Sequence, residues 1–159
     1  MSSNLQKPNI EELINSPDLN DSIIELDDYI CALCEWGHNL PALSNPEKVF
    51  YFNQELEREI NNGGFDQYFH NTSGNYANET VETLNLIGAN KTAKILEAAM
   101  EIFPDKKAPV DRNLRQNVID YIGDTRDEHW GQLDQQFFKY EDNLSELNIE
   151  FVRKNKQYF

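Results

Sequence analysis

The most informative stretch of this 159-residue chain is Glu59-Ile-Asn-Asn-Gly63-Gly64-Phe65-Asp-Gln67-Tyr68-Phe69-His70-Asn71-Thr-Ser73-Gly74. It follows a segment with helical periodicity, and two adjacent glycines interrupt it where a helix is expected to end. Glycine readily adopts the left-handed backbone conformation that terminates helices, and we expect Gly63 to be the terminating residue. The stretch therefore predicts a sharp corner between two helical segments.

The corner combines hydrogen-bonding side chains with aromatic rings. Its residues are Glu59, Asn61, Asn62, Gly63, Gly64, Phe65, Gln67, Tyr68, Phe69, His70, Asn71, Ser73 and Gly74. One interpretation is structural: the polar side chains bond backbone groups left free at the helix ends, and the rings exclude water. The other is a recognition pocket, lined by Glu59, Gln67, His70 and Asn71. Residue types do not choose between the two, but we expect Glu59 to be partly buried and bonded within the corner.

The rest of the chain repeats apolar residues at helical spacing and has no sustained alternation of apolar and polar residues. This pattern predicts an all-α fold, a single irregular bundle of seven or eight helices. A chain of this length builds one core without metal or disulfide. We expect one domain over residues 1–159, with residues 1–20 as a loosely attached N-terminal segment.

Three of the expected helices have a well-defined start or apolar face. From Ser22 one helix carries a single apolar stripe that ends before Pro41, made of Ile23, Leu26, Ile30, Leu33 and Leu40. A second begins either with a capping box from Ser44 to Glu47 or with Asn45 as the cap and proline in the first turn. A third is capped by Asp111 and is expected to bury Leu114, Val118 and Tyr121.

The chain is strongly acidic, with 28 Asp and Glu against 14 Lys and Arg and a formal charge of −14. Such a charge repels nucleic acid and anionic membranes, so we expect neither as a direct partner. No run of apolar residues is long enough to span a bilayer or to act as a secretion signal. Cys31 and Cys34 fall inside a helical pattern, where we expect them to pack as reduced thiols in the cytoplasm.

The acids are concentrated toward the start of the chain. The first 62 residues hold 12 acids and 3 bases, net −9, whereas the remaining 97 hold 16 acids and 11 bases, net −5. On the helix from Ser22, four acids project opposite the apolar stripe: Asp21, Glu25, Asp28 and Glu35. No Lys or Arg lies between Lys7 and Lys48, so these acids have no cation one helical turn away. They form either a solvated face or a surface for a basic partner.

Spacing limits how closely one such helix imitates DNA. Four acids over 14 residues give about one charge per 5 Å of helix, whereas a DNA strand carries one per roughly 3.4 Å. Acids from neighbouring segments have to complete a convincing array, and the nearest in sequence are Glu47, Glu55 and Glu57. A second subunit is another source of charge.

The sequence offers little recognisable catalytic chemistry. His38, His70 and His129 lie far apart, without the spacing that places two metal ligands on one helical face. Cys31 and Cys34 match a redox pair in spacing only, because no strand pattern precedes them. There is no glycine-rich phosphate loop or dinucleotide fingerprint. We therefore expect a protein that is not an enzyme and uses no cofactor or metal, with acid–base chemistry by a carboxylate beside His70 as the weaker alternative.

The block from Glu59 to Gly74 resembles the hallmark of a bacterial family known mostly as a domain of unknown function, one of whose members is described as an acidic DNA mimic. Similarity continues through Asn75-Tyr76-Ala77, Leu86-Ile87-Gly88-Ala89 and Ile102-Phe103-Pro104, and again in Tyr140-Glu141-Asp142-Asn143-Leu144. It does not extend to the first forty or so residues.

The resemblance implies a non-enzymatic interaction protein that occupies the DNA-binding surface of a basic partner, such as a helix-turn-helix regulator of transcription. It also allows a homodimer. In this interpretation Asp21, Glu25, Asp28 and Glu35 stand in for phosphates, and Glu47, Glu55 and Glu57 complete the array. The alternatives are a ligand-binding or catalytic pocket at the corner between Asn61 and Gly74, and a neutralising partner of a basic toxin.

Overall fold

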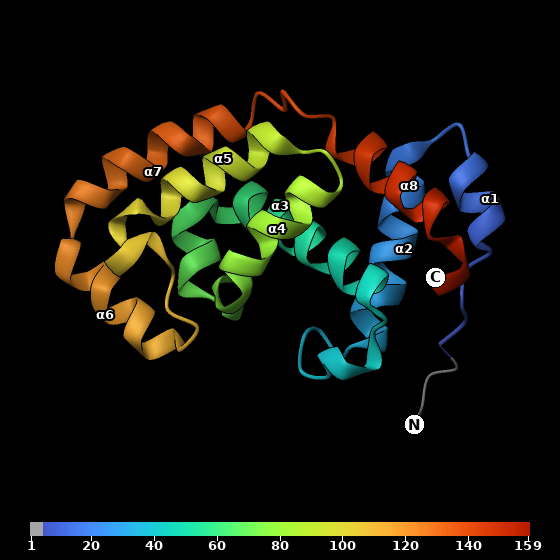
Figure 1. Ribbon diagram of the computed structural model, residues 1–159, viewed down its shortest axis with the longest axis horizontal. Coiled ribbons are helices and arrows are strands. Elements are labelled where there is room, and N and C mark those ends of the chain that lie inside the picture. The colour runs from blue at the N-terminus through green and yellow to red at the C-terminus, as the bar shows by residue number, and fades with distance from the viewer. Residues whose placement is uncertain (1–4) are drawn as a thin grey trace. The chain divides into compact units, whose positions relative to one another are not determined.

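The structure is a computed structural model that describes residues 5–159 (Figure 1). Within these residues it has eight α-helices, joined by loops and short 3-10 turns, and no strand, which confirms the predicted all-α fold. The helices are α1 Ile10–Asn15, α2 Leu19–Leu33, α3 Asn45–His70, α4 Ala77–Leu86, α5 Asn90–Ala99, α6 Arg112–Ile122, α7 Asp124–Phe137 and α8 Leu144–Lys154.

The contacts between residues divide the chain into two compact units. The first unit comprises the residues up to Tyr51 together with Asn143–Phe159, and the second unit comprises Phe52–Asp142. The expectation of one domain over the whole chain stays a prediction, and each unit is described on its own.

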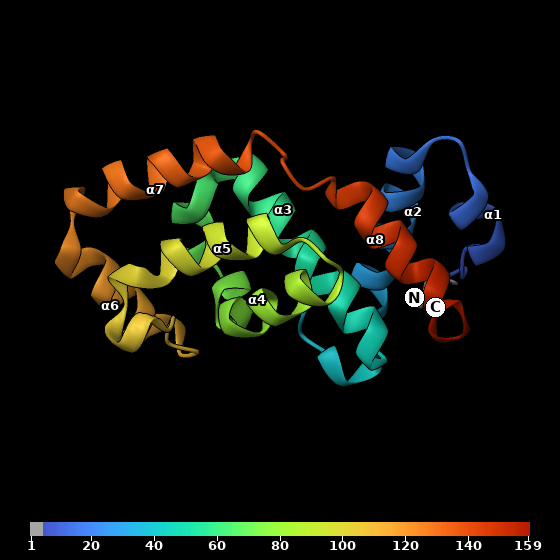
Figure 2. The same ribbon diagram turned by 45° about the horizontal axis from the view of Figure 1, so that its top comes forward.

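The first unit is built from α1, α2 and α8, which pack on one another (Figure 2). Leu26 and Ile30 of α2 and Val152 of α8 are fully buried between them. Arg153 of α8 donates a hydrogen bond from Nη2 to the carbonyl oxygen of Ile14 (2.6 Å), so α1 is bonded at its C-terminal end. Helix α1 is therefore tied to α8.

Helix α2 is shorter than the sequence predicted. It ends at Leu33, and the next residues turn back, with positive φ at Glu35 (53°), Trp36 (55°) and Gly37 (91°). The amide of Trp36 donates to the carbonyl oxygen of Cys31 (2.8 Å), a bond that closes the last turn of a helix. The prediction of one helix up to Leu40 was wrong, because the chain ends α2 through its own backbone before it reaches Pro41.

The start of α3 uses one of the two predicted arrangements. The amide of Ser44 donates to Oε2 of Glu47 (2.7 Å), and the amide of Glu47 donates to Oγ of Ser44 (3.2 Å). These reciprocal bonds are a capping box. The interpretation with Ser44 as the cap is therefore confirmed.

The second unit packs α4 against α5, α5 against α7, and α6 against α7. Its core is aromatic: the ring of Phe69 stacks on Trp130 at 5.1 Å between centroids and meets Phe103 edge-on at 5.1 Å. Trp130 Nε1 also donates to the carbonyl oxygen of Ala99 (2.9 Å), which holds α7 on α5. These contacts place α5 and α7 around the corner that follows the glycine pair.

Helix α6 buries a different face from the one predicted. Asp111 does cap it, accepting from the amide of Leu114 (2.9 Å). However, Leu114 and Tyr121 are 59% and 91% exposed, and the fully buried residues are Arg115 and Ile119. The helix is turned so that an arginine, rather than the apolar stripe, faces the corner.

Candidate functional site

The corner predicted from the glycine pair is a break inside α3. Gly63 has φ −159° and ψ 19°, and Gly64 has φ 70° and ψ −169°, so the helix stops and restarts in a new direction. The left-handed residue is Gly64 rather than Gly63, which corrects the prediction by one position. Its combination of angles is accessible essentially to glycine alone.

The helical segment after the break is capped from a distant part of the chain. The amide of Phe65 donates to Oδ1 of Asp134 (2.9 Å), which lies on α7. Burial raises the pKa of Asp134, while the bond from Phe65 opposes that shift. A Cβ on Gly64 would collide with the same carboxylate. Glycine at position 64 therefore leaves room for the cap.

Glu59 joins the two sides of the break. Its Oε2 accepts hydrogen bonds from Nε2 of Gln67 (3.0 Å) and from Nδ2 of Asn71 (2.8 Å). The side chain is half-buried, which confirms the expectation that Glu59 is partly buried and bonded within the corner. One carboxylate thus links the segments before and after the glycines.

Arg115 holds the far end of the corner, and it was not among the predicted residues. Its guanidinium donates to the carbonyl oxygens of Phe69 (2.6 Å), Asn71 (2.7 Å) and Pro109 (2.7 Å), and to Oδ1 of Asn75 (2.9 Å). The side chain is completely buried, and burial lowers its pKa. Arg115 therefore replaces water as the donor for carbonyl groups at the end of the corner.

The aromatic residues of the corner are part of the core. Phe65, Tyr68 and Phe69 are at most 1% exposed. Burial raises the pKa of Tyr68, whose hydroxyl lies 3.4 Å from Oγ1 of Thr80. Ser73 donates to the carbonyl oxygen of Tyr68 (2.8 Å). These rings seal one side of the corner.

The remaining polar residues lie toward the outside. Asn61 and Asn62 are exposed, and Asn61 donates to the hydroxyl of Tyr140 (2.7 Å) and to the carbonyl oxygen of Glu57 (2.9 Å). Nδ1 of His70 lies 2.8 Å from the carbonyl oxygen of Asp66. The four residues named for a ligand pocket are thus engaged with one another or with nearby backbone, which favours the structural interpretation of the corner.

The predicted acidic face lies on α2, in the first unit. Asp21, Glu25 and Asp28 are exposed and share one side of the helix, opposite the buried Ile23, Leu26 and Ile30. Glu35 is exposed too, but it lies in the turn after α2 and not on the helical face. Within residues 5–159 none of these four carboxylates forms an ion pair.

The three acids expected to extend this face are less exposed than the acids on α2, and each is bonded to another group. Glu47 is only 7% exposed, and its carboxylate is bonded in the capping box. Glu55 pairs with Arg58 (3.3 Å), and Glu57 accepts from the hydroxyl of Tyr140 (3.1 Å). Glu47 therefore does not supply an exposed charge as predicted, the charge of Glu55 is partly balanced by Arg58, and Glu57 is hydrogen-bonded to a neutral hydroxyl.

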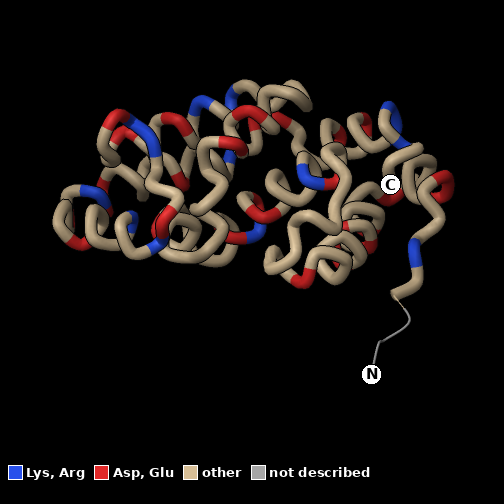
Figure 3. Tube along the Cα trace, turned by 60° about the horizontal axis from the view of Figure 1, so that its bottom comes forward, with Lys and Arg blue, Asp and Glu red and all other residues tan. Residues whose placement is uncertain are grey.

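The charge imbalance seen along the sequence disappears in the folded units. The first unit holds 11 acids and 5 bases, net −6 over 68 residues, and the second unit holds 17 acids and 9 bases, net −8 over 91 residues. The two densities are nearly equal because residues 143–159 add two acids and three bases to the first unit, and residues 52–62, with three acids and one base, belong to the second unit. Figure 3 shows acidic and basic residues on segments of both units. The α2 face is thus distinguished by its lack of cations and not by the total charge of its unit.

Membrane-spanning helices, metal sites and reactive cysteines are the other features considered. None of the helices within residues 5–159 is both long enough and apolar enough to span a bilayer. In the same part of the chain, no group of three or more His, Cys, Asp or Glu side chains gathers that could hold a metal ion. Cys31 and Cys34 are buried and are not joined to each other by a disulfide.

These features define an acidic all-helical protein organised around a glycine-broken helix. Residues 41–155, which are 115 of the 159, match the DMP19-like protein family, and the chain belongs to that family. The family is one of DNA mimics, in agreement with the resemblance drawn from the sequence. No curated protein and no solved structure matches the chain significantly.

The extent of the family match separates the two candidate sites. It includes the whole corner with Arg115 and Asp134, but it begins at Pro41. Asp21, Glu25, Asp28 and Glu35 precede that residue. Family membership therefore extends to the corner, while the α2 acids are singled out by their exposure and charge alone.

Proposed function

We propose that this protein is a DNA mimic that occupies the DNA-binding surface of a basic regulator, and that the acidic face of α2 contributes contacts. The observation that carries the second part is the row of Asp21, Glu25 and Asp28, which is exposed on one side of a helix and forms no ion pair with any residue from 5 to 159. Membership of the DMP19-like family supports the first part.

The geometry of the row supports a partial imitation of a DNA strand. Residues 21 to 28 span about 10 Å of helix, so three carboxylates are spaced by about 5 Å, compared with roughly 3.4 Å between phosphates. A partner that uses Lys and Arg to bind phosphates meets fewer charges per length here than on DNA. Further contacts have to come from other acids, with Glu35 in the following turn as one source.

The proposed partner is a helix-turn-helix regulator of transcription, and the proposed setting is the cytoplasm, where the two buried cysteines stay reduced. Neutralisation of a basic toxin uses the same electrostatics and differs in the identity of the partner. A ligand-binding or catalytic role of the corner is less well supported, because its polar side chains bond one another.

The test begins with recovery of basic proteins from host cytosol on the immobilised chain at low salt, followed by elution in a salt gradient. The recovered DNA-binding protein is then mixed with its labelled DNA, and release of the DNA by this protein is measured. We expect release to weaken steeply with added salt, because charge pairs across such an interface are screened.

A matched pair of charge reversals tests the role of α2. The first variant is Asp21→Lys/Glu25→Lys/Asp28→Lys. The control is Glu79→Lys/Glu82→Lys/Glu97→Lys, which makes the same change in net charge with acids of the second unit. We expect the α2 variant to lose at least about 100-fold in competition and the control to lose much less, since contacts across an interface are local. Equal losses in both variants would contradict a specific role of α2.

A further inference from the structure

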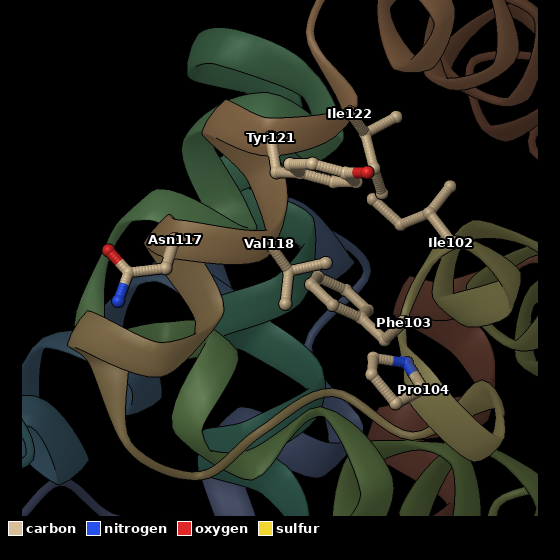
Figure 4. A pocket seen from close by; sticks show the side chains of 7 residues that line it. All are labelled: Ile102, Phe103, Pro104, Asn117, Val118, Tyr121 and Ile122. Atoms are coloured by element: carbon tan, nitrogen blue, oxygen red, sulfur yellow. The ribbon is translucent and has the colours of Figure 1, made fainter.

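Two hollows on the second unit differ in charge. The hollow between α6 and residues 102–104 has an uncharged lining (Figure 4). The other hollow lies between α5 and the end of α7 and has a volume of about 370 Å³. Its charged lining residues are Lys91, Lys94 and Lys139 together with a single acid, Glu141, and we call it the lysine pocket. In a chain with 28 acids and 14 bases, it is a local excess of positive charge.

Helix α5 supplies one wall of the lysine pocket. Lys91, Lys94, Ile95 and Ala98 recur at helical spacing, so they fall within an arc of about 100° of the helix at 100° per residue. Lys91 and Lys94 are exposed, whereas Ile95 and Ala98 are half-buried. The wall therefore combines two ammonium groups with a small apolar surface.

The segment that follows α7 supplies another wall, and hydrogen bonds fix its position. Oδ2 of Asp142 accepts from the amide of Thr92 (2.7 Å) and from its hydroxyl (3.0 Å), which ties this segment to the first turn of α5. Nδ2 of Asn61 donates to the hydroxyl of Tyr140 (2.7 Å). The two pocket residues on either side of Tyr140 therefore belong to a segment that is anchored at neighbouring positions.

The positive charge of the pocket is not neutralised by ion pairs in the described part of the chain. Lys91, Lys94 and Lys139 form no ion pair with any residue from 5 to 159, although Glu141 lines the same pocket. Like charges three positions apart on a helix repel each other, and the helix dipole opposes a cation in the first turn. Both effects apply on α5, where Lys91 lies in the first turn. A bound anion offsets both.

The chemistry of the lining restricts the kind of anion. Lysine ammonium groups donate hydrogen bonds and accept none, which suits a phosphate group. The Glu141 carboxylate accepts, and the Gln136 amide does both, so hydroxyl groups beside the phosphate have partners. A polyanion longer than the Debye length, about 8 Å at physiological salt, also meets exposed acids elsewhere on the surface, whereas a small anion does not. The volume is near the lower end of the range of about 300–1,000 Å³ that is typical of small-molecule sites.

We propose that the lysine pocket binds a small phosphate monoester that carries hydroxyl groups, either a sugar phosphate or a nucleotide. The phosphate lies among the three lysine ammonium groups, and the neutral part of the ligand rests on Ile95 and Ala98. The site belongs to the second unit, uses none of the α2 acids and does not depend on DNA mimicry.

Titration of the full chain at physiological salt, followed by the NMR shifts of its backbone amides, measures both affinity and position. The probes are ribose 5-phosphate and adenosine 5′-monophosphate, their counterparts ribose and adenosine, and inorganic phosphate. We expect both monoesters to shift amides of residues 91–98 and 136–141, with dissociation constants of about 1 mM or lower, at least about tenfold below those of the counterparts. Absence of these shifts, or equal affinity for inorganic phosphate and the monoesters, would overturn the proposal.

The two monoesters distinguish the two sources of the phosphate. Affinity for ribose 5-phosphate that equals or exceeds affinity for the nucleotide identifies a sugar phosphate as the ligand. Tighter binding of the nucleotide places its base on the apolar part of the α5 wall, because that is where the pocket offers apolar contact.

A matched pair of double substitutions assigns binding to the lysines of the pocket. Lys94→Gln/Lys139→Gln removes two charges from the lining, and Lys106→Gln/Lys107→Gln removes two exposed charges from the loop before α6. We expect the first variant to weaken binding of ribose 5-phosphate at least about tenfold and the second to weaken it less than about twofold, since charges beyond the Debye length are screened. Equal losses would overturn the proposal. Because the substituted side chains are exposed, both variants should unfold at nearly the temperature of the unsubstituted chain.

Discussion

The corner of the second unit and the acidic face of the first unit use polar residues in opposite ways. In the corner, Glu59, Arg115 and Asp134 are each bonded to groups brought in from other segments. On α2, Asp21, Glu25 and Asp28 are exposed and have no ionic partner in the part of the chain that the structure describes. The family match covers the first region and not the second. The bonded residues of the corner therefore lie inside the matched segment, whereas the residues proposed to meet a partner lie outside it.

The largest loss of stability is expected on substitution of Arg115, because its hydrogen bonds hold the far end of the corner together. Arg115→Met leaves buried carbonyl groups without a donor, and we expect a loss of about 4 kcal/mol in the free energy of unfolding, measured with urea. Arg115→Lys keeps the charge but supplies fewer donors in a different geometry, so its loss should be intermediate. A stability unchanged by Arg115→Met would show that the bonds of the corner contribute little.

Gly64 is the next most sensitive position. We expect Gly64→Ala to cost about 3 kcal/mol, because alanine is strained at this backbone conformation and its Cβ displaces the carboxylate that caps Phe65. Gly131→Ala on α7 is the control, since nothing lies within 4 Å of a Cβ at that position. Alanine there should raise stability by up to about 1 kcal/mol, through its higher helix propensity. Equal effects of the two substitutions would contradict the role assigned to the break.

Asp134 gives a smaller effect with a defined pH dependence. Asp134→Ala removes the cap and should cost about 1 kcal/mol, whereas Asp134→Asn keeps an oxygen that accepts from Phe65. The folded-state pKa of Asp134 is raised above 3.8, so the protonated form is favoured by folding. Its contribution to stability is therefore present at low pH and is lost as the pH rises through the folded-state pKa. Unfolding curves from pH 3 upward should show the wild type losing stability relative to Asp134→Asn, and an opposite trend would contradict the cause assigned to the shift.

The smallest effect on stability is expected for a substitution on the acidic face, and it is a gain rather than a loss. Glu25 lies one turn from both Asp21 and Asp28, so like charges repel along this side of α2. Glu25→Lys replaces this repulsion by attraction and should raise stability by about 0.5 kcal/mol, with Glu25→Gln in between. The measurement is thermal unfolding at low salt, repeated at high salt, where the gain should shrink. A loss of stability would indicate that these acids have a structural role.

Local features of the chain were predictable from the sequence. The glycine pair, the capping box at Ser44 and the cap at Asp111 depend on residues within a few positions of one another. All three lie where their patterns indicate, except that the left-handed residue of the pair is Gly64 and not Gly63. Helical periodicity likewise predicted the all-α fold. The end of α2 was missed, because it depends on positive φ at Glu35 and Trp36, which residue types do not favour.

Long-range features were not predictable in the same way. Asp134 lies 69 residues from the amide it caps, and nothing local marks it as a cap. Arg115 is an arginine on an amphipathic helix, where exposure is the ordinary outcome, and only the carbonyl groups of the corner explain its burial. The same rotation of α6 exposes Leu114 and Tyr121. Periodicity identifies an apolar face but does not say whether its own chain covers it.

The first unit is made of two segments that are far apart in the sequence, and this affects its synthesis on the ribosome. Its opening segment, up to Tyr51, packs with Asn143–Phe159, so 91 intervening residues are translated between its two parts. At roughly 5–20 residues per second this delay is about 5–18 s. During that time the apolar side of α2 lacks α8, which packs on it in the folded unit. The first unit therefore cannot be completed until its second segment has been translated.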